Sequence, residues 1–137
     1  MSNYVSILVG AIVALMLAYL LRTHPSWWFL RERDPDERPW QDLFTPREMP
    51  VVQSALQAVV EAFLLRKSDI YRLRPSDRLL AIYRAAYPDK QAPDGLEFET
   101  LSKQLVSKFH VPEAIIAEER DPCVEDVVRW CLRYSGA

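Results

Sequence analysis

Glycine is scarce in this chain, with only 3 among its 137 residues. Loops that bind nucleotide phosphates use several neighbouring glycines, because the backbone must approach the phosphate closely. Here the glycines stand far apart, at Gly10, Gly95 and Gly136. The sequence therefore contains no glycine-rich phosphate loop.

Histidine and cysteine are equally few, with two of each. Cys123 and Cys131 fall in one predicted helix, where their separation of roughly 12 Å is too long for a disulfide. Neither His24 nor His110 has a metal-ligand partner at a useful spacing. We expect two reduced, apolar core cysteines, no metal site and no cofactor.

The chain has no excess of either charge, because 17 Lys and Arg face 19 Asp and Glu. A nearly balanced surface lacks the broad basic field that attracts nucleic acid, so we expect no nucleic-acid partner. No carboxylate pair is marked as special, and no Ser or Cys has an obvious histidine base. We predict that the protein is not an enzyme and has no catalytic residues.

The longest apolar run lies at the N-terminus, where Tyr4 to Leu21 contains no charged residue. A helix of this length reaches about 27 Å, close to the roughly 30 Å hydrocarbon core of a bilayer. We predict a transmembrane anchor over residues 1–22. A cleaved signal peptide is the alternative, but no basic residue precedes the run and no clear cleavage site follows it.

The flanks of this run predict its orientation. Arginines follow the run and none precedes it: Arg22, Arg31, Arg33 and Arg38. The positive-inside rule then places the N-terminus outside and the following domain in the cytoplasm.

Two further features accompany the predicted anchor. The aromatic residues Trp27, Trp28 and Phe29 follow just beyond it. Their rings suit the headgroup layer of a membrane, although they could also pack on the following domain. The small residues Gly10, Ala14 and Ala18 share one face of the predicted helix. Such a face permits close packing against another helix, although it could instead simply contact lipid.

Beyond the anchor, residues 23–44 read as an aromatic and charged juxtamembrane linker, and residues 45–137 as a cytoplasmic helical domain. Apolar residues recur in this domain with helical spacing, and no stretch alternates as a strand would. Helices are expected near 50–66, 73–88, 94–109 and 112–118, and from Asp121 onwards. The fold class is therefore all-α: a small bundle preceded by one transmembrane helix.

The stretch "DGLEFETLSKQLVSKFHVPEAIIAEERDPCVEDVVRWCLRY" (94–134) resembles the second half of an acyl carrier protein. That family opens its second helix with Asp-Ser-Leu and an acidic residue, and closes with a short helix and a capped final helix. Asp94, Leu96 and Glu97 match the opening motif. The resemblance implies an acyl-carrier-like helical bundle over the domain and a bacterial inner-membrane setting.

Gly95 stands where the family carries the serine that bears phosphopantetheine. That attachment requires an oxygen nucleophile, which glycine lacks. The resemblance therefore implies a degenerate carrier without phosphopantetheine. A true acyl carrier, modified at an unexpected residue, is an alternative.

The resemblance still implies that the domain docks a partner protein. Acidic residues around the family's second helix meet basic patches on partner enzymes, and the matching candidates here are Asp94, Glu97 and Glu99. These acids could instead only cap the helix and favour its positive end.

We therefore predict a membrane-anchored, non-catalytic, carrier-like adaptor. It would dock a protein partner at the cytoplasmic face, such as a lipid- or acyl-handling enzyme or a secretion assembly. A structural subunit of a membrane complex, assembled through the transmembrane helix, is the other prediction.

Overall fold

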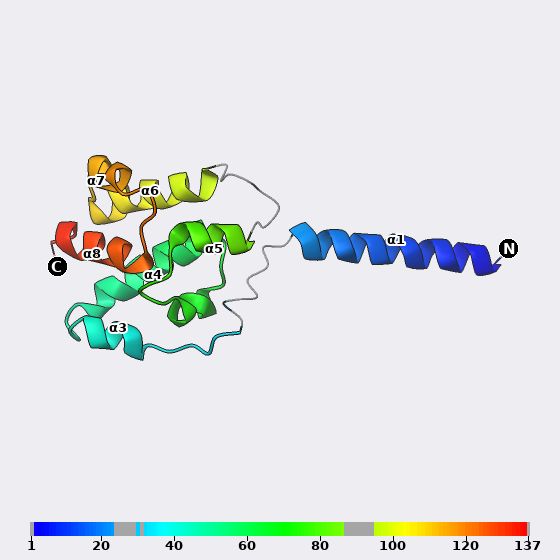
Figure 1. Cartoon of the computed structure of the whole chain (residues 1–137), viewed down its shortest axis with the longest axis horizontal. Helices are drawn as coiled ribbons and strands as arrows, with labels where there is room; N and C mark the ends of the chain where they lie inside the picture. Colours follow the sequence, from blue (N-terminus) through cyan, green and yellow to red (C-terminus); the bar gives the residue numbers. More distant parts are fainter. Residues whose placement is uncertain (1, 24–29, 31, 87–94, 137) are drawn as a thin grey trace.

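The structure, a computed structural model, describes residues 2–23, 30, 32–86 and 95–136. Its regular elements are all helical, and Figure 1 shows their arrangement. In chain order they are α1 (Ser2–Thr23), α3 (Arg38–Leu43), α4 (Met49–Ala62), the 3₁₀ helix η1 (Lys67–Arg72), α5 (Leu79–Ala86), α6 (Leu96–Phe109), α7 (Glu113–Glu118) and α8 (Val124–Tyr134).

The all-α prediction for the domain is confirmed. The only strand-like pairing within the described residues is a single antiparallel bridge between Arg78 and Cys123. This bridge joins the start of α5 to the start of α8, two segments that are distant in sequence.

The predicted transmembrane anchor is corrected by the structure. Among the described residues, no helix combines the length and the apolar character needed to cross a membrane. The anchor at 1–22 and the single-pass inner-membrane localisation are therefore contradicted.

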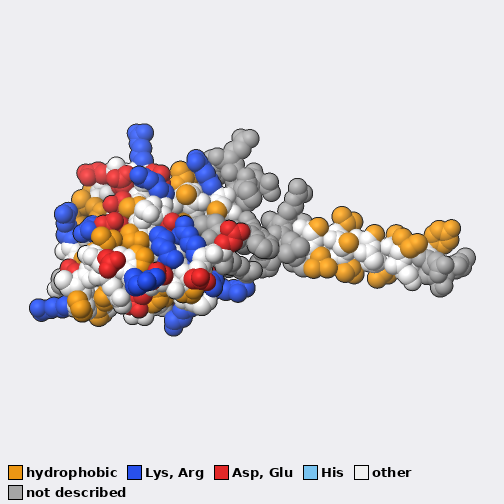
Figure 2. Space-filling model, turned by 60° about the horizontal axis from the view of Figure 1, so that its bottom comes forward, with side chains coloured by type: hydrophobic (Ala, Val, Ile, Leu, Met, Phe, Trp, Pro, Cys, Tyr) orange, Lys and Arg blue, Asp and Glu red, His pale blue; other side chains and the backbone are white. Residues whose placement is uncertain are grey.

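The side chains of α1 that the structure describes, at 4–18, contribute nothing to the core of the bundle. Its large apolar side chains are exposed, from Val13 at 49% to Tyr4 at 80%. Figure 1 shows α1 extending away from the other helices, and Figure 2 shows hydrophobic side chains along it, whereas charges of both signs cover the bundle.

The centre of the bundle is α4, which packs against α8, α6 and η1. Its buried residues cover a broad part of its circumference: Val52, Ala55, Leu56, Ala58, Val59, Val60 and Ala62. Alanines among them leave room for neighbouring helices to approach closely. A helix that is apolar on so many sides is stable only inside a bundle.

A separate turn precedes α4. Glu48 accepts hydrogen bonds from the backbone N–H and the hydroxyl of Thr45, at 2.8 and 3.0 Å. Met49 then begins the main helix, and Pro50 lies in its first turn, where the missing N–H costs little.

Three aromatic rings join α5 and α6 to the end of α4. The ring of Phe98 meets Phe63 edge-on at 5.4 Å and lies 5.7 Å from the ring of Tyr83, between centroids. Such tilted and edge-to-face pairs are favourable beyond the area they bury. They fix the side of α6 that faces the core.

The N-cap of α8 lies two residues after Asp121, the position from which the last helix was expected. Its N-cap is Cys123, whose backbone N–H donates to the carboxylate of Asp126 at 2.9 Å. An acid at the third helical position satisfies a donor at the helix start, and Asp126 has this role in α8.

The predicted linker over 23–44 belongs in part to the fold. Leu30 and Trp40 are fully buried, and Phe44 is 5% exposed and stacks on Trp40 at 6.2 Å. Because these side chains share the core cluster with α4 and α8, the packed domain begins before the predicted boundary at residue 45.

Candidate functional site

The start of α6 holds the stretch that resembles the opening motif of the carrier family's second helix. Gly95 is the N-cap and has a φ of 84°, in the left-handed region that favours glycine. No heavy atom lies within 4 Å of where its Cβ would stand. Gly95 offers no nucleophile, and Asp94 lies outside the described residues.

The two other acids predicted for docking occupy different environments. Glu99 is exposed, and its carboxylate meets the ammonium of Lys103 at 2.8 Å. The hydrogen bond from Lys103 holds the pKa of Glu99 below its ordinary value. Glu99 therefore remains on a surface that a partner can reach.

Glu97, in contrast, is only 6% exposed. Its Oε2 atom is buried without a hydrogen-bond partner. A carboxylate in this position cannot form part of a docking surface, which corrects the expectation for this residue. The sequence carried the signal, because 97, 101, 105 and 109 form one four-residue series and the last three are core positions.

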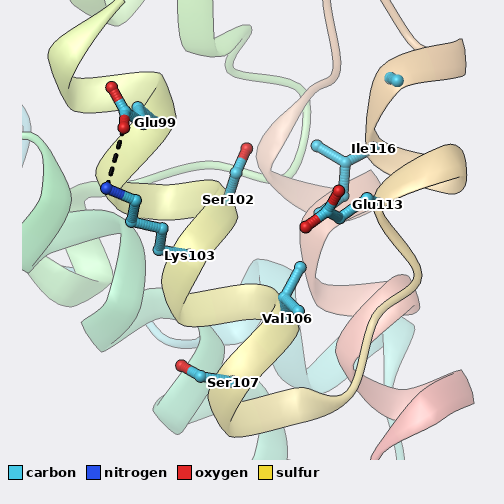
Figure 3. A pocket seen from close by; sticks show the side chains of 8 residues that line it. Glu99, Ser102, Lys103, Val106, Ser107, Glu113 and Ile116 are labelled. Atoms are coloured by element: carbon cyan, nitrogen blue, oxygen red, sulfur yellow. Dashed lines mark ion pairs between the residues drawn. The ribbon is translucent and has the colours of Figure 1, made fainter.

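An open groove of about 560 Å³ lies between α6 and α7. Its lining side chains come from both helices: Glu99, Ser102, Lys103, Val106, Ser107, Glu113, Ile116 and Ala117. Figure 3 shows Ser102 and Val106 facing Glu113 and Ile116 across the groove. The exposed lining is mostly apolar, and the Glu99–Lys103 pair lies on its rim.

A smaller cavity of about 290 Å³ adjoins this groove on the core side. The two share Ser102, Ile116 and Ala117, and core residues such as Leu105 and Val127 line the inner one. No residue of α7 is fully buried. This short helix therefore lies between the open groove and the inner cavity, and its residues line both.

A second groove, of about 590 Å³, lies between the end of α3 and α8. Its lining is predominantly polar, and several of its charges are already engaged. Glu48 holds Thr45, Asp126 caps α8, and Arg129 pairs with Glu125 at 2.7 Å while lying 5.1 Å above the ring of Phe44. The α6–α7 groove is the more apolar of the two.

Both cysteines are free, but only Cys131 is the core residue that was expected, because Cys123 is partly exposed at the N-cap of α8. Cys131 is fully buried, and burial raises its pKa to about 12. Burial also raises the pKa of Cys123, whose Sγ lies 3.2 Å from the carboxylate of Asp126. In the part of the chain that the structure describes, no group of three or more His, Cys, Asp or Glu could hold a metal.

The remaining predicted positions lie on α1 or outside the described residues. The three small residues Gly10, Ala14 and Ala18 lie on α1. No heavy atom lies within 4 Å of where a Cβ on Gly10 would stand. The aromatic trio lies outside the described residues: Trp27, Trp28 and Phe29.

Compared with known proteins, the chain matches no protein-family profile, no curated protein and no solved structure. The resemblance to acyl carrier proteins therefore stays a prediction, and the geometry of the α6–α7 groove is the basis for assigning a function.

Proposed function

We propose that the protein is a non-catalytic adaptor that docks a partner protein through the α6–α7 groove and carries no phosphopantetheine. The observation that carries the proposal is the groove itself, an apolar depression with a charged rim. Surfaces of this kind hold the apolar side chains of a partner while polar groups at the edge set their orientation.

The charges around the groove indicate what the partner presents. Glu99 is already neutralised by Lys103. Glu113 faces the groove, and no ion pair joins it to another described residue. An apolar side chain against Val106 and Ile116, beside a lysine or arginine near Glu113, would complement this surface.

The class of partner rests on the resemblance to acyl carrier proteins. It favours a lipid- or acyl-handling enzyme, or a secretion assembly. The missing hydroxyl at Gly95 supports docking without the family's carrier chemistry.

Site-specific photo-crosslinking tests the proposal. A crosslinking amino acid at Val106 or Ala117 should capture the same partner, whereas one at Gln53, exposed on α4 and outside both grooves, should not. Val106→Asp and Glu113→Lys should each reduce capture at least tenfold, and Gln53→Lys should leave it unchanged. Equal capture from all three positions would refute the groove as the docking site.

A second candidate function follows from α1. Ile7 and Leu15 are 69% and 70% exposed on a helix with apolar residues on every side. Water-exposed helices of this composition need a partner surface to be stable. The protein would then be a structural subunit whose α1 packs against other subunits.

Rearranging α1 separates the two candidates. A variant that keeps its composition but moves Gly10, Ala14 and Ala18 out of their common face changes close helix packing alone. Loss of the native assembly, measured by native mass spectrometry, favours the subunit. An intact assembly with groove-dependent crosslinking favours the adaptor.

A further inference from the structure

Residues 32–40, which we call the strap, cross the bundle beside η1 (Figure 1). The strap is bound through its backbone. The N–H of Asp36 donates to the carbonyl of Tyr71 at 2.9 Å, and the guanidinium of Arg74 donates to the carbonyls of Asp34 and Asp36 at 3.0 and 3.3 Å. The chain leading from α1 is therefore fastened to the bundle before α3 begins.

The closest contact of the strap is made by Arg33. Its guanidinium donates two hydrogen bonds to the carboxylate of Asp77, at 2.6 and 2.9 Å, and a third to the carbonyl of Arg72 at 3.2 Å. The two side chains are 31% and 11% exposed. A two-pronged, partly buried pair of this kind is stronger than an ordinary surface ion pair.

Asp77 also forms hydrogen bonds with the turn that contains it and with the start of α8. Its carboxylate accepts the backbone N–H of Arg74 at 2.8 Å, and its carbonyl accepts the N–H of Val124 at 2.8 Å. The next amide, of Glu125, donates to the carbonyl of Pro75 at 3.0 Å. One residue therefore contacts the strap through its side chain and the first turn of α8 through its backbone.

We propose that the strap and the first turn of α8 form one cooperative opening unit joined at Asp77. In the closed state, Arg33 fixes the side chain of Asp77, and the turn 74–77 presents its carbonyls to α8. When the strap leaves, that turn loses its outer support, and the first hydrogen bonds of α8 loosen with it. A change in the chain next to α1 is thus transmitted to α8, on the opposite side of the turn.

Hydrogen exchange of the full-length chain, resolved by mass spectrometry, tests the coupling. Arg33→Ala should accelerate exchange roughly tenfold at the strap amide of Asp36 and, to a similar extent, at Val124 and Glu125. Arg33→Lys keeps the charge but loses the two-pronged geometry, so it should give an intermediate acceleration at both places.

Arg38→Ala is the matched control. Arg38 belongs to the same strap and pairs with Asp36 at 2.9 Å, but its side chain is 82% exposed and does not contact Asp77. It should leave exchange at Val124 unchanged. The amides of α4 serve as the reference for opening of the whole bundle.

Three results would overturn the proposal. Acceleration in the strap without any change at Val124 and Glu125 would show that the two segments open separately. If hydrogen exchange is accelerated in neither segment, Arg33 does not hold the strap against the bundle. Equal acceleration in α4 would show that the opening unit is the whole bundle.

Discussion

The indole N–H of Trp40 donates a hydrogen bond to the backbone carbonyl of Leu73 at 3.0 Å. Both residues are fully buried. The bond joins α3 to the turn after η1, across a stretch of chain that contains the whole of α4. Trp40 thereby connects the segment before the predicted domain to its core.

Replacing Trp40 by phenylalanine should destabilise the domain by about 1–3 kcal/mol, because the carbonyl of Leu73 would remain buried without a donor. Replacement by alanine should cost about 3–5 kcal/mol, since it also leaves a cavity. Urea unfolding followed by circular dichroism measures both. If Trp40→Phe equals the parent protein in stability, the hydrogen bond contributes nothing net.

Glu97 should be a position where loss of charge stabilises the fold. Its Oε2 atom is buried without a partner, and burying such a group costs free energy. Glu97→Met keeps a similar length and should raise the free energy of unfolding by about 1 kcal/mol, measured by urea titration.

Glu99→Met is the control for that substitution, because Glu99 lies on the same helix but is exposed and paired with Lys103. Surface changes of this kind stay within about 0.5 kcal/mol. A destabilised Glu97→Met protein would show that the buried carboxylate makes a favourable interaction in solution.

The buried thiol of Cys131 predicts a loss of stability in alkali. Below pH 9.0, its ordinary pKa, the thiol is neutral in the folded and unfolded states, so its ionisation does not affect folding. Between pH 9.0 and about 12, the unfolded chain releases a proton that the folded chain retains. Stability should therefore fall as pH rises, by up to about 1.4 kcal/mol for each pH unit.

Cys131→Ala isolates this contribution, because other groups titrate in the same range and are common to both proteins. The parent should lose stability between about pH 8 and 10.5 faster than the variant, in urea titrations at each pH. Parallel losses would mean that the thiol is not the titrating group.

The lack of a side-chain nucleophile at Gly95 leads to a prediction about the mass of the protein. Material purified from its native source should show no added mass of phosphopantetheine, because Gly95 at the start of α6 offers no nucleophile. An added phosphopantetheine would support the alternative of a true carrier, and peptide mapping would locate the modified residue.

Gly95→Ser restores the hydroxyl that the family uses. Since Gly95 has a positive φ, we expect this change to cost about 1 kcal/mol of stability, although space for the side chain is open. Treatment with a phosphopantetheinyl transferase then shows whether α6 is recognised as a carrier helix. Gly95→Ala controls for the strain alone.

Periodicity in the sequence predicted the longer helices of the bundle, but the helix expected near 73–88 begins only at Leu79, and the 3₁₀ helix at Lys67–Arg72 was not expected. The helices expected near 94–109 and 112–118 correspond to α6 (Leu96–Phe109) and α7 (Glu113–Glu118). These features are local, because each depends on residues within one or two turns of each other.

Features set by distant contacts were not predictable in the same way. Trp40 lies in a charged, proline-rich stretch that is typical of a linker, and its burial depends on contacts with Phe44 and with the distant Leu73. Arg33 likewise has no sequence signal that names Asp77 as its partner. The groove depends on the placement of α7, whose two isoleucines do not by themselves indicate the helix they face.

The bridge between Arg78 and Cys123 closes the chain into a loop whose two ends meet. Within that loop lie α5, α6 and α7, and with them the whole α6–α7 groove. The free-energy cost of closing a loop rises only slowly with its length. Residues could therefore be inserted or removed around α7 while α8 keeps its register, so the groove can be reshaped during evolution or by design without rebuilding the frame that supports it.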